Sequence, residues 1–345
     1  MIEIIHLIPK KLVYGAGSML DELYFAIDKY YENKVRQSII SLSYKHSGQG
    51  SYVNTFKLLH HIKSKYTNPV VFMHKIAATR CEDVSQALFG KIPFNIINHT
   101  QLPNPKGLAN CDNLICVSDF MYRTLKDRVK CKNIVMIRNG VNACRYEQIK
   151  PLQHDDRAEY FISGRMNNLN ITKHSKTWLK WITENPIGGV SHWHDYLGGG
   201  TFFDSSYNFA SKSNKKSMNH RFRIHINLPG KIVNFDEKVS YIKSWDVFLY
   251  EIVKEEGTSM SMLESLACGK PAIINNKPGN IECIKKHING YVCKNRENMQ
   301  DKLVYLAKNP KALLDMKDST KDYFINHLDA KYMALKYVEL AESIL

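Results

Sequence analysis

The chain has 345 residues, enough for two domains of ordinary size, and its 44% hydrophobic content predicts buried cores and excludes a disordered or fibrous protein. Its formal net charge of +15 favours partners that carry phosphate: a nucleotide, a nucleic acid or an anionic membrane surface. No run of about 18 apolar residues occurs, and the N-terminus lacks the basic region and cleavage site of a signal peptide, so we expect a cytoplasmic protein without a transmembrane segment.

The eight cysteines form no C-x-x-C pair, and their spacing matches no zinc-binding pattern. We therefore interpret them as reduced thiols, most of them buried, in a reducing compartment.

Apolar runs alternate with amphipathic segments through the first half of the chain, which predicts a parallel α/β sheet. A polar stretch with Pro151 and the Asp155-Asp156 pair then predicts a linker between two domains. We expect strands at residues 2–8, 38–42, 70–73, 94–97, 113–117 and 134–137, with helices at 19–30 and 119–127 among them.

Two features of this first half could belong to a ligand site. Gly15-Ala16-Gly17 follows the first strand and opens a helix, but Leu20 stands where a dinucleotide-binding fingerprint has its third glycine, so a structural turn is the plainer interpretation. His99 follows the strand at 94–97, and His74 is a second candidate of this type.

The second half restarts with a strand at 159–163 that leads into Gly164-Arg165, and further strands are expected at 223–227, 247–249 and 272–275. The sequence His-Trp-His-Asp at 192–195 has metal-ligating side chains, but nothing completes a metal site, and we interpret it as a loop. Residues 195–219, rich in Gly, Ser, Asn and Lys, predict a long loop. Residues 329–345 predict an amphipathic helix.

The most informative stretch begins with Glu256 and continues through small residues to Glu264, after an apolar run that ends at Tyr250. This pattern predicts a strand, a loop and then the N-terminus of a helix that ends at Gly269. Free N–H groups and the helix dipole at such a terminus attract an anion. The two carboxylates could then hold hydroxyl groups on either side of that anion, as a sugar, a diphosphate and a ribose would require. The alternative is a pair of solvated glutamates.

The same stretch resembles the E-x7-E signature of retaining glycosyltransferases with the GT-B fold, in particular family 4 (group 1). The resemblance covers roughly residues 1–20 and 95–295. Residues 278–282 resemble the family's Gly-Gly-x-x-Glu turn, 290–292 its G-x-V, 111–119 its A-D-x-x-I-x-V-S strand and 134–142 its V-I-P-N-G-V-D. In the last of these, Arg138 replaces the proline and Asn142 the aspartate.

The resemblance implies an α/β protein of the GT-B type, with two Rossmann-like parallel-sheet domains that face each other across a cleft. We expect an acceptor-side domain at 1–148, a linker at 149–158, a nucleotide-sugar-binding domain at 159–325 and a C-terminal helix at 326–345 that packs back on the first domain.

The resemblance also implies roles for individual residues. Glu256 would contact the sugar, Glu264 the ribose, and Arg165 with Lys173 the diphosphate, although Lys173 comes three residues later than the family's lysine. His99 would lie close to the transferred sugar. The remaining donor-binding residues implied by the resemblance are Gly15, Gly17, Gly164, Gly257, Thr258, Ser259, Met260, Ser261 and, near the base, Ile232.

The implied activity is retaining transfer of a sugar from a nucleotide-diphosphate sugar, with a UDP-sugar as the expected donor, to a hydroxyl acceptor by a front-face mechanism. No metal or other cofactor is expected, because the chain has no D-x-D motif, which typifies the metal-dependent GT-A type. The acceptor stays open. It is a saccharide or lipid-linked glycan at an anionic membrane surface to which the protein is peripheral, or DNA with a hydroxylated base, in a host cytoplasm if the protein is viral. The alternative is a non-catalytic protein of the same fold that binds nucleotide-sugar or nucleic acid.

Overall fold

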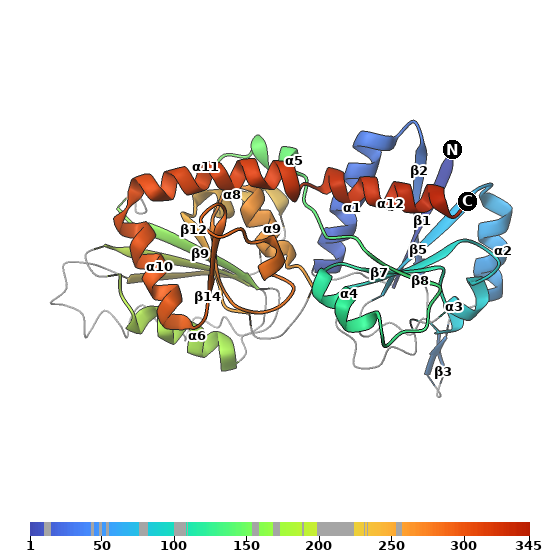
Figure 1. Ribbon diagram of the computed structural model, residues 1–345, viewed down its shortest axis with the longest axis horizontal. Coiled ribbons are helices and arrows are strands. Elements are labelled where there is room, and N and C mark those ends of the chain that lie inside the picture. The colour runs from blue at the N-terminus through green and yellow to red at the C-terminus, as the bar shows by residue number, and fades with distance from the viewer. Residues whose placement is uncertain are drawn as a thin grey trace.

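The structure, a computed structural model, contains two α/β domains that lie side by side (Figure 1). Each domain is built on a six-stranded sheet in which all described pairs of neighbouring strands are parallel. The structure describes residues 1–9, 15–42, 45–47, 50–52, 55–75, 82–99, 108, 110–153, 159–167, 173–187, 190–198, 224–230, 232, 234–252 and 257–345.

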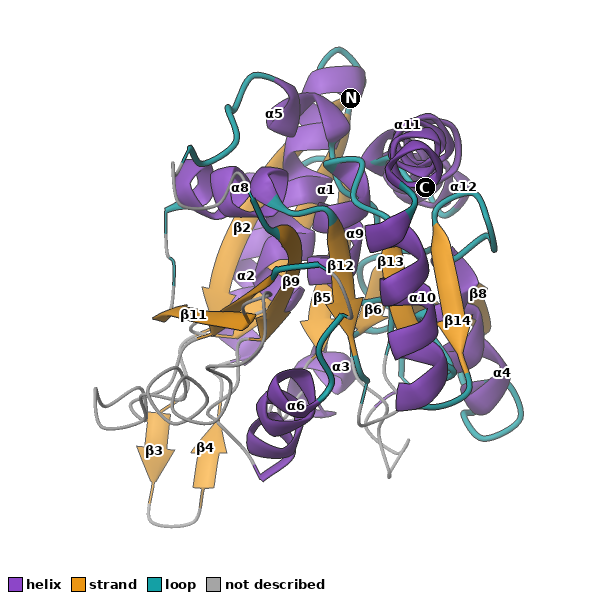
Figure 2. Ribbon diagram, turned by 90° about the vertical axis from the view of Figure 1, so that its left-hand side faces the viewer, coloured by secondary structure: helices purple, strands orange, loops and turns teal. Residues whose placement is uncertain are grey.

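The first sheet has the strand order β2-β1-β5-β6-β7-β8, and the predicted strands of the first half are confirmed. A separate antiparallel pair, β3 and β4, projects away from the sheets (Figure 2). The elements are β1 (Ile2–Pro9), α1 (Gly15–Tyr31), β2 (Val35–Leu42), β3 (Lys45–Ser47), β4 (Gly50–Tyr52), α2 (Thr55–Lys65), β5 (Pro69–Lys75), α3 (Glu82–Leu88), β6 (Phe94–Asn98), β7 (Asn113–Cys116), α4 (Asp119–Leu125), β8 (Asn133–Met136) and α5 (Ala143–Glu147).

The second sheet has the order β11-β10-β9-β12-β13-β14. The four strands predicted for this half are confirmed, while β10 and β14 lie outside them. The elements are β9 (Phe161–Asn167), α6 (Lys173–Glu184), β10 (His192–Gly198), β11 (Ile224–Gly230), α8 (Phe235–Ser244), β12 (Val247–Tyr250), α9 (Met260–Ala267), β13 (Ala272–Asn275), η3 (Ile281–Cys283), β14 (Gly290–Cys293), α10 (Arg296–Lys308), α11 (Pro310–His327) and α12 (Ala330–Ser343).

The expectation of a loop at 192–195 is wrong, because these residues form the first half of β10, between β9 and β11. The polar side chains are buried and most of their polar atoms are hydrogen-bonded, although Nδ1 of His192 has no partner among the described residues. The carboxylate of Asp195 accepts hydrogen bonds of 2.8 Å from the indole N–H groups of Trp193 and Trp245. Burial of a polar group is tolerated when its hydrogen bonds are made. The long loop predicted at 195–219 is also wrong at 195–198, which complete β10, and its remainder, 199–219, lies outside the described residues.

The last helix, α12, packs on the first domain. α11 runs over the second domain and α12 continues in nearly the same direction over the first (Figures 1 and 2). There α12 packs on α1 and β1, with Tyr337 edge-to-face against Phe72 of β5 at 5.4 Å between ring centroids. Asp329, which caps α12, also accepts a hydrogen bond of 3.0 Å from the N–H of Ala143 at the start of α5.

Candidate active site

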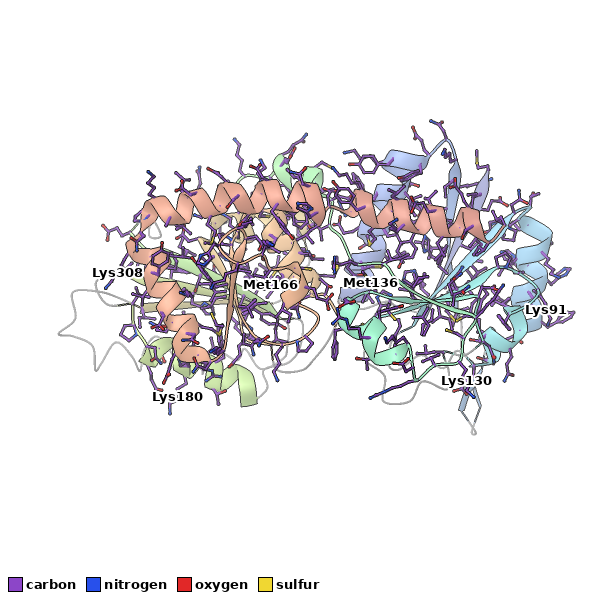
Figure 3. The ribbon with its side chains drawn as sticks, viewed as in Figure 1. Lys91, Lys130, Met136, Met166, Lys180 and Lys308 are labelled. Carbon is purple, nitrogen blue, oxygen red and sulfur yellow. The ribbon has the colours of Figure 1, made fainter. Side chains whose placement is uncertain are left out.

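The two domains meet where strands of both sheets end. Residues 257–259, which directly precede α9, lie against the end of β7. The hydroxyl of Thr258 donates to the carbonyl of Val117 at 3.3 Å, and a Cβ atom added to Gly257 would lie only 2.8 Å from Cγ2 of Val117. A side chain at Gly257 would therefore push the loop away from the first domain. Figure 3 shows Met166 of β9 and Met136 of β8 on the sides of the two domains that face each other.

A second contact between the domains is made by Glu282 of η3. Its two carboxylate oxygens accept hydrogen bonds of 2.8 Å from the backbone N–H groups of Asp119 and Phe120, which begin α4 of the first domain. Arg138 lies 3.5 Å from the same carboxylate. A carboxylate is stabilised at a helix N-terminus because the unpaired N–H groups and the helix dipole both favour negative charge.

The start of α9 is suited to an anion. Ser259 is the N-cap, but its side chain makes no capping hydrogen bond, and the first described bond of the helix runs from the N–H of Leu263 to the carbonyl of Ser259. A Cβ atom added to Gly15 would lie 3.6 Å from Cγ of Met260, so α1 and α9 begin beside each other. The adjoining N-termini of two helices make this region electropositive through their backbone N–H groups and dipoles.

Arg165 lies near the carboxyl end of β9 and is only 1% exposed. Its guanidinium lies over the rings of Trp178, Tyr196 and Tyr250, 5.0 to 5.3 Å from their centroids. Among the described residues, its Nε and Nη1 atoms have no hydrogen-bond partner, and burial lowers the pKa of the guanidinium. Aromatic faces attract the cation but cannot satisfy all its N–H groups, so the guanidinium retains the capacity to bind an anion.

Arg165 and the start of α9 belong to neighbouring strands of the sheet. β9 pairs with β12, with Gly164 opposite Phe248, and the chain that leaves β12 leads to α9. Tyr250, at the end of β12, contributes one ring around Arg165. Ligands of parallel α/β sheets bind beyond the carboxyl ends of such strands.

Gly164 has a packing role that the sequence did not predict. A Cβ atom at this position would fall inside the indole ring of Trp245. This close approach is sufficient to explain why residue 164 is a glycine.

Glu264, in the middle of α9, is buried and is bound by Lys238 of α8, with 2.9 Å between Nζ and Oε1. A ligand hydroxyl that reached Glu264 would share the carboxylate with this lysine. The pair is charged, so its hydrogen bonds are stronger than those between neutral groups.

His99 directly follows β6 and is partly buried. Its Nε2 atom lies 3.1 Å from Nδ1 of the fully buried His74. Burial lowers the pKa of His99 to about 4, so the ring is neutral at pH 7. The carbonyl oxygen of His99 lies 3.9 Å from a Cβ atom built on Gly257, which places this residue at the junction of the domains.

The other predicted site residues are distributed as follows. Glu256 lies outside the described residues, and Lys173 is the first residue of α6, with a side chain that also lies outside them. Ser261, in the first turn of α9, has its hydroxyl 2.9 Å from that of Ser259. Gly17 is in the first turn of α1, and Ile232 is a partly buried residue after β11.

The sequence did not identify the aromatic rings around Arg165. Tyr250 closes an apolar strand immediately before the Glu256 loop, which was the available signal. Trp178 and Tyr196 come from α6 and β10, and the composition of the β10 segment predicts a loop rather than a strand.

The described part of the chain contains no group of three or more His, Cys, Asp or Glu side chains that could hold a metal ion. Within the same residues, no helix is both long enough and apolar enough to span a bilayer.

Comparison with known proteins relates the chain to glycosyltransferases. Residues 208–323 match the family of glycosyl transferases group 1. An uncharacterized glycosyltransferase of Methanocaldococcus jannaschii is 25% identical over 217 residues, which are 62% of this chain and 55% of that protein. The match thus spans about half the length of this relative.

Solved structures extend the likeness to the whole chain. A glycosyltransferase from Rickettsia africae has a TM-score of 0.73 at 16% identity, with 99% of this chain and 98% of that chain covered. Anabaena HepE in complex with UDP has a TM-score of 0.71 at 12% identity, with coverage of 99% and 100%. Sucrose-phosphate synthase from Thermosynechococcus elongatus has 0.69 at 13%, with 99% and 98%. The chain therefore has the two-domain GT-B fold, and most of its second domain matches the group 1 glycosyltransferases.

Proposed function

We propose that this protein transfers a sugar from a nucleotide-diphosphate sugar, with a UDP-sugar as the expected donor, to a hydroxyl acceptor with retention of anomeric configuration. The observation that carries the proposal is the buried guanidinium of Arg165. Its Nε and Nη1 atoms, which have no partner among the described residues, lie near the end of β9, beside the strand that leads to the start of α9, where the described residues provide no side-chain cap. The group 1 match and the fold support the same class of reaction.

The chemistry follows from where charge develops. As the bond between the anomeric carbon and the diphosphate oxygen breaks, the leaving diphosphate gains negative charge. Arg165, Lys173 and the two helix N-termini stabilise that charge more in the transition state than in the bound donor. These groups supply the positive charge that a divalent ion supplies in metal-dependent glycosyltransferases, so turnover requires no metal.

The remaining roles concern the sugar and the acceptor. Glu256 and Glu264 hold hydroxyl groups of the sugar and the ribose. The acceptor oxygen attacks the anomeric carbon from the face that the diphosphate leaves, and the departing phosphate oxygen takes the acceptor's proton. This front-face route needs no pair of carboxylates flanking the bond, unlike a glycosidase.

The test is release of nucleotide from a panel of UDP-, GDP- and ADP-sugars in EDTA, followed by determination of the product's anomeric configuration by NMR. Arg165→Met should reduce release from the preferred donor. Lys308→Met, which removes an exposed charge at the end of α10, should not (Figure 3). Release that requires a divalent ion, or an inverted product, would overturn the mechanism. A lack of both donor release and donor binding would favour the non-catalytic alternative.

The acceptor is proposed from charge alone, as a glycan at an anionic membrane or DNA with a hydroxylated base. Exposed lysines lie on both domains, including Lys91 and Lys130 on the first and Lys180 and Lys308 on the second (Figure 3). Such a spread suits an extended polyanionic surface. Sugar transfer to vesicle-bound glycan or to modified duplex DNA, each with affinity that falls as salt rises, distinguishes the two.

A further inference from the structure

A chain of hydrogen bonds connects His99 to the edge of the first sheet. The strand order β2-β1-β5-β6 brings Gln37, His6, His74 and His99 side by side, although they are far apart in sequence. The distances are 3.1 Å from Gln37 Oε1 to His6 Nε2, 3.2 Å from His6 Nδ1 to His74 Nε2, and 3.1 Å from His74 Nδ1 to His99 Nε2. His6 and His74 are fully buried, so of the three rings only that of His99 belongs to a residue with exposed surface.

The orientation of the Gln37 amide sets the direction of the chain. Its nitrogen donates to the carbonyl of Tyr24 at 2.9 Å and to the carboxylate of Asp28 at 2.7 Å, both in α1. The reverse orientation would place the amide oxygen against two acceptors. The oxygen of Gln37 therefore faces His6, whose Nε2 atom must donate to it.

The three rings are neutral at pH 7. Burial lowers the pKa of His6 to about 4 and that of His74 well below its usual value, as it lowers the pKa of His99. A neutral imidazole has one N–H group and one lone pair, so fixing one nitrogen fixes the other. Because Nε2 of His6 donates, its Nδ1 accepts from Nε2 of His74, and Nδ1 of His74 accepts from Nε2 of His99.

We propose that Gln37, His6 and His74 are positioning residues that hold His99 in the Nε2–H tautomer, so that its Nδ1 atom accepts a hydrogen bond from a hydroxyl of the donor sugar. The hydrogen bond from the donor sugar to His99 depends on the proposed function, whereas the tautomer of His99 does not. A carboxylate on the sugar, which can only accept hydrogen bonds, gains nothing at this lone pair. This relay of Gln37, His6, His74 and His99 therefore favours a sugar with a hydroxyl at the position that faces His99.

The geometry agrees with this assignment. The planes of the His74 and His99 rings are nearly parallel, 13° apart, and their centroids are 5.3 Å apart while Nδ1 of His74 and Nε2 of His99 are 3.1 Å apart, so these two nitrogens face each other. Neither His6 nor His74 can reach the bound sugar, because both are fully buried. They act on the ligand only through His99, as partners that orient a ligating histidine do.

The direct test is 15N NMR of the full-length protein labelled at histidine, with the His99 signals assigned by their loss in His99→Gln. The expected spectrum shows a protonated Nε2 and an unprotonated Nδ1 at His6, His74 and His99. A protonated Nδ1 at His99 in the wild-type protein would overturn the inference. This measurement needs neither a donor nor activity.

A substitution at Gln37, the end of the relay farthest from His99, tests whether a change there alters the tautomer of His99. In Gln37→Lys the ammonium group pairs with Asp28 and can only donate to His6, so every ring should change to the Nδ1–H tautomer, including His99 three hydrogen bonds away. The matched control is Ile39→Lys, which adds the same charge at an exposed position of β2 and should leave all three rings unchanged. A folded Gln37→Lys protein with an unchanged His99 tautomer would refute the relay.

Addition of the preferred nucleotide-sugar separates the two halves of the proposal. Acceptance of a hydrogen bond should shift the Nδ1 resonance of His99 upfield, while UDP alone should not. If the tautomers are as expected but a bound donor sugar leaves this resonance unmoved, the role of His99 at the sugar fails and the relay stands. If no donor binds at all, the proposed function itself fails.

Discussion

Replacing Arg165 by methionine should separate stability from activity. The substitution removes two buried N–H donors that have no partner among the described residues, each costing about 1–3 kcal/mol. It also removes three cation–π contacts worth about 0.5–2 kcal/mol each, which methionine partly replaces by contacts of its sulfur with the same rings. These terms nearly cancel, so we expect the free energy of unfolding of the second domain to change by no more than about 1 kcal/mol.

The activity of Arg165→Met should fall far more. Loss of one fixed donor to a developing anion typically costs about 2.7–4 kcal/mol, so kcat/KM should decrease about 100- to 1,000-fold. The kcat/KM of Arg165→Lys should lie between that of the wild-type protein and that of Arg165→Met, because lysine retains the charge but not the fork of donors.

The chain itself provides the assay. Its four tryptophans, at positions 178, 181, 193 and 245, all lie in the second domain, so urea unfolding followed by tryptophan fluorescence reports that domain alone. Nucleotide release gives kcat/KM on the same preparations. A loss of more than about 3 kcal/mol of unfolding free energy with turnover preserved would show that Arg165 is a structural residue.

Three further predictions follow from other contacts. Gly164→Ala should destabilise the second domain by about 3 kcal/mol in the same fluorescence assay, because the new methyl group would overlap the indole of Trp245; a change below about 1 kcal/mol would contradict the packing. Stability should decrease as pH falls from 6.5 to 5. Burial lowers the pKa of His6 and His192 from 6.5 to about 4, so the unfolded chain takes up protons that the folded protein does not. The loss is about 2 kcal/mol for each histidine at pH 5, and thermal unfolding temperatures that stay flat from pH 7 to 5 would refute it. Glu282→Gln should increase hydrogen exchange of the first two amides of α4 about tenfold, because the amide offers one acceptor in place of a carboxylate that serves both; unchanged rates would show that the two domains separate too readily for this contact to matter.

Much of the fold was predictable because buried parallel strands appear as apolar runs between amphipathic segments. β10 was missed for a physical reason. Most of the polar atoms on its buried residues have partners on other elements, such as Trp245 for Asp195 and Ser163 for Nε2 of His192 and for His194. Sequence periodicity carries no information about such partners.

The candidate site was predictable to the extent that it is contiguous in sequence. The loop at 257–259 and the start of α9 follow a recognisable strand, and the residue pair at 164–165 lies in one. The relay behind His99 was not predictable, because His6 and Gln37 become its neighbours only through the strand order β2-β1-β5-β6. An apolar pattern indicates that strands exist but not which strands are adjacent.

The position of α12 has a consequence for dividing the protein. The first domain is discontinuous in sequence, since α12 supplies Tyr337 against Phe72 and Asp329 against the start of α5. A fragment that ends after α5 would expose this apolar face to water and should aggregate. A circular permutant that begins at Asp329, with a flexible peptide joining Leu345 to Met1, would make the first domain one continuous segment. Such a permutant is the form in which the first domain could be expressed and its ligands sought without the second.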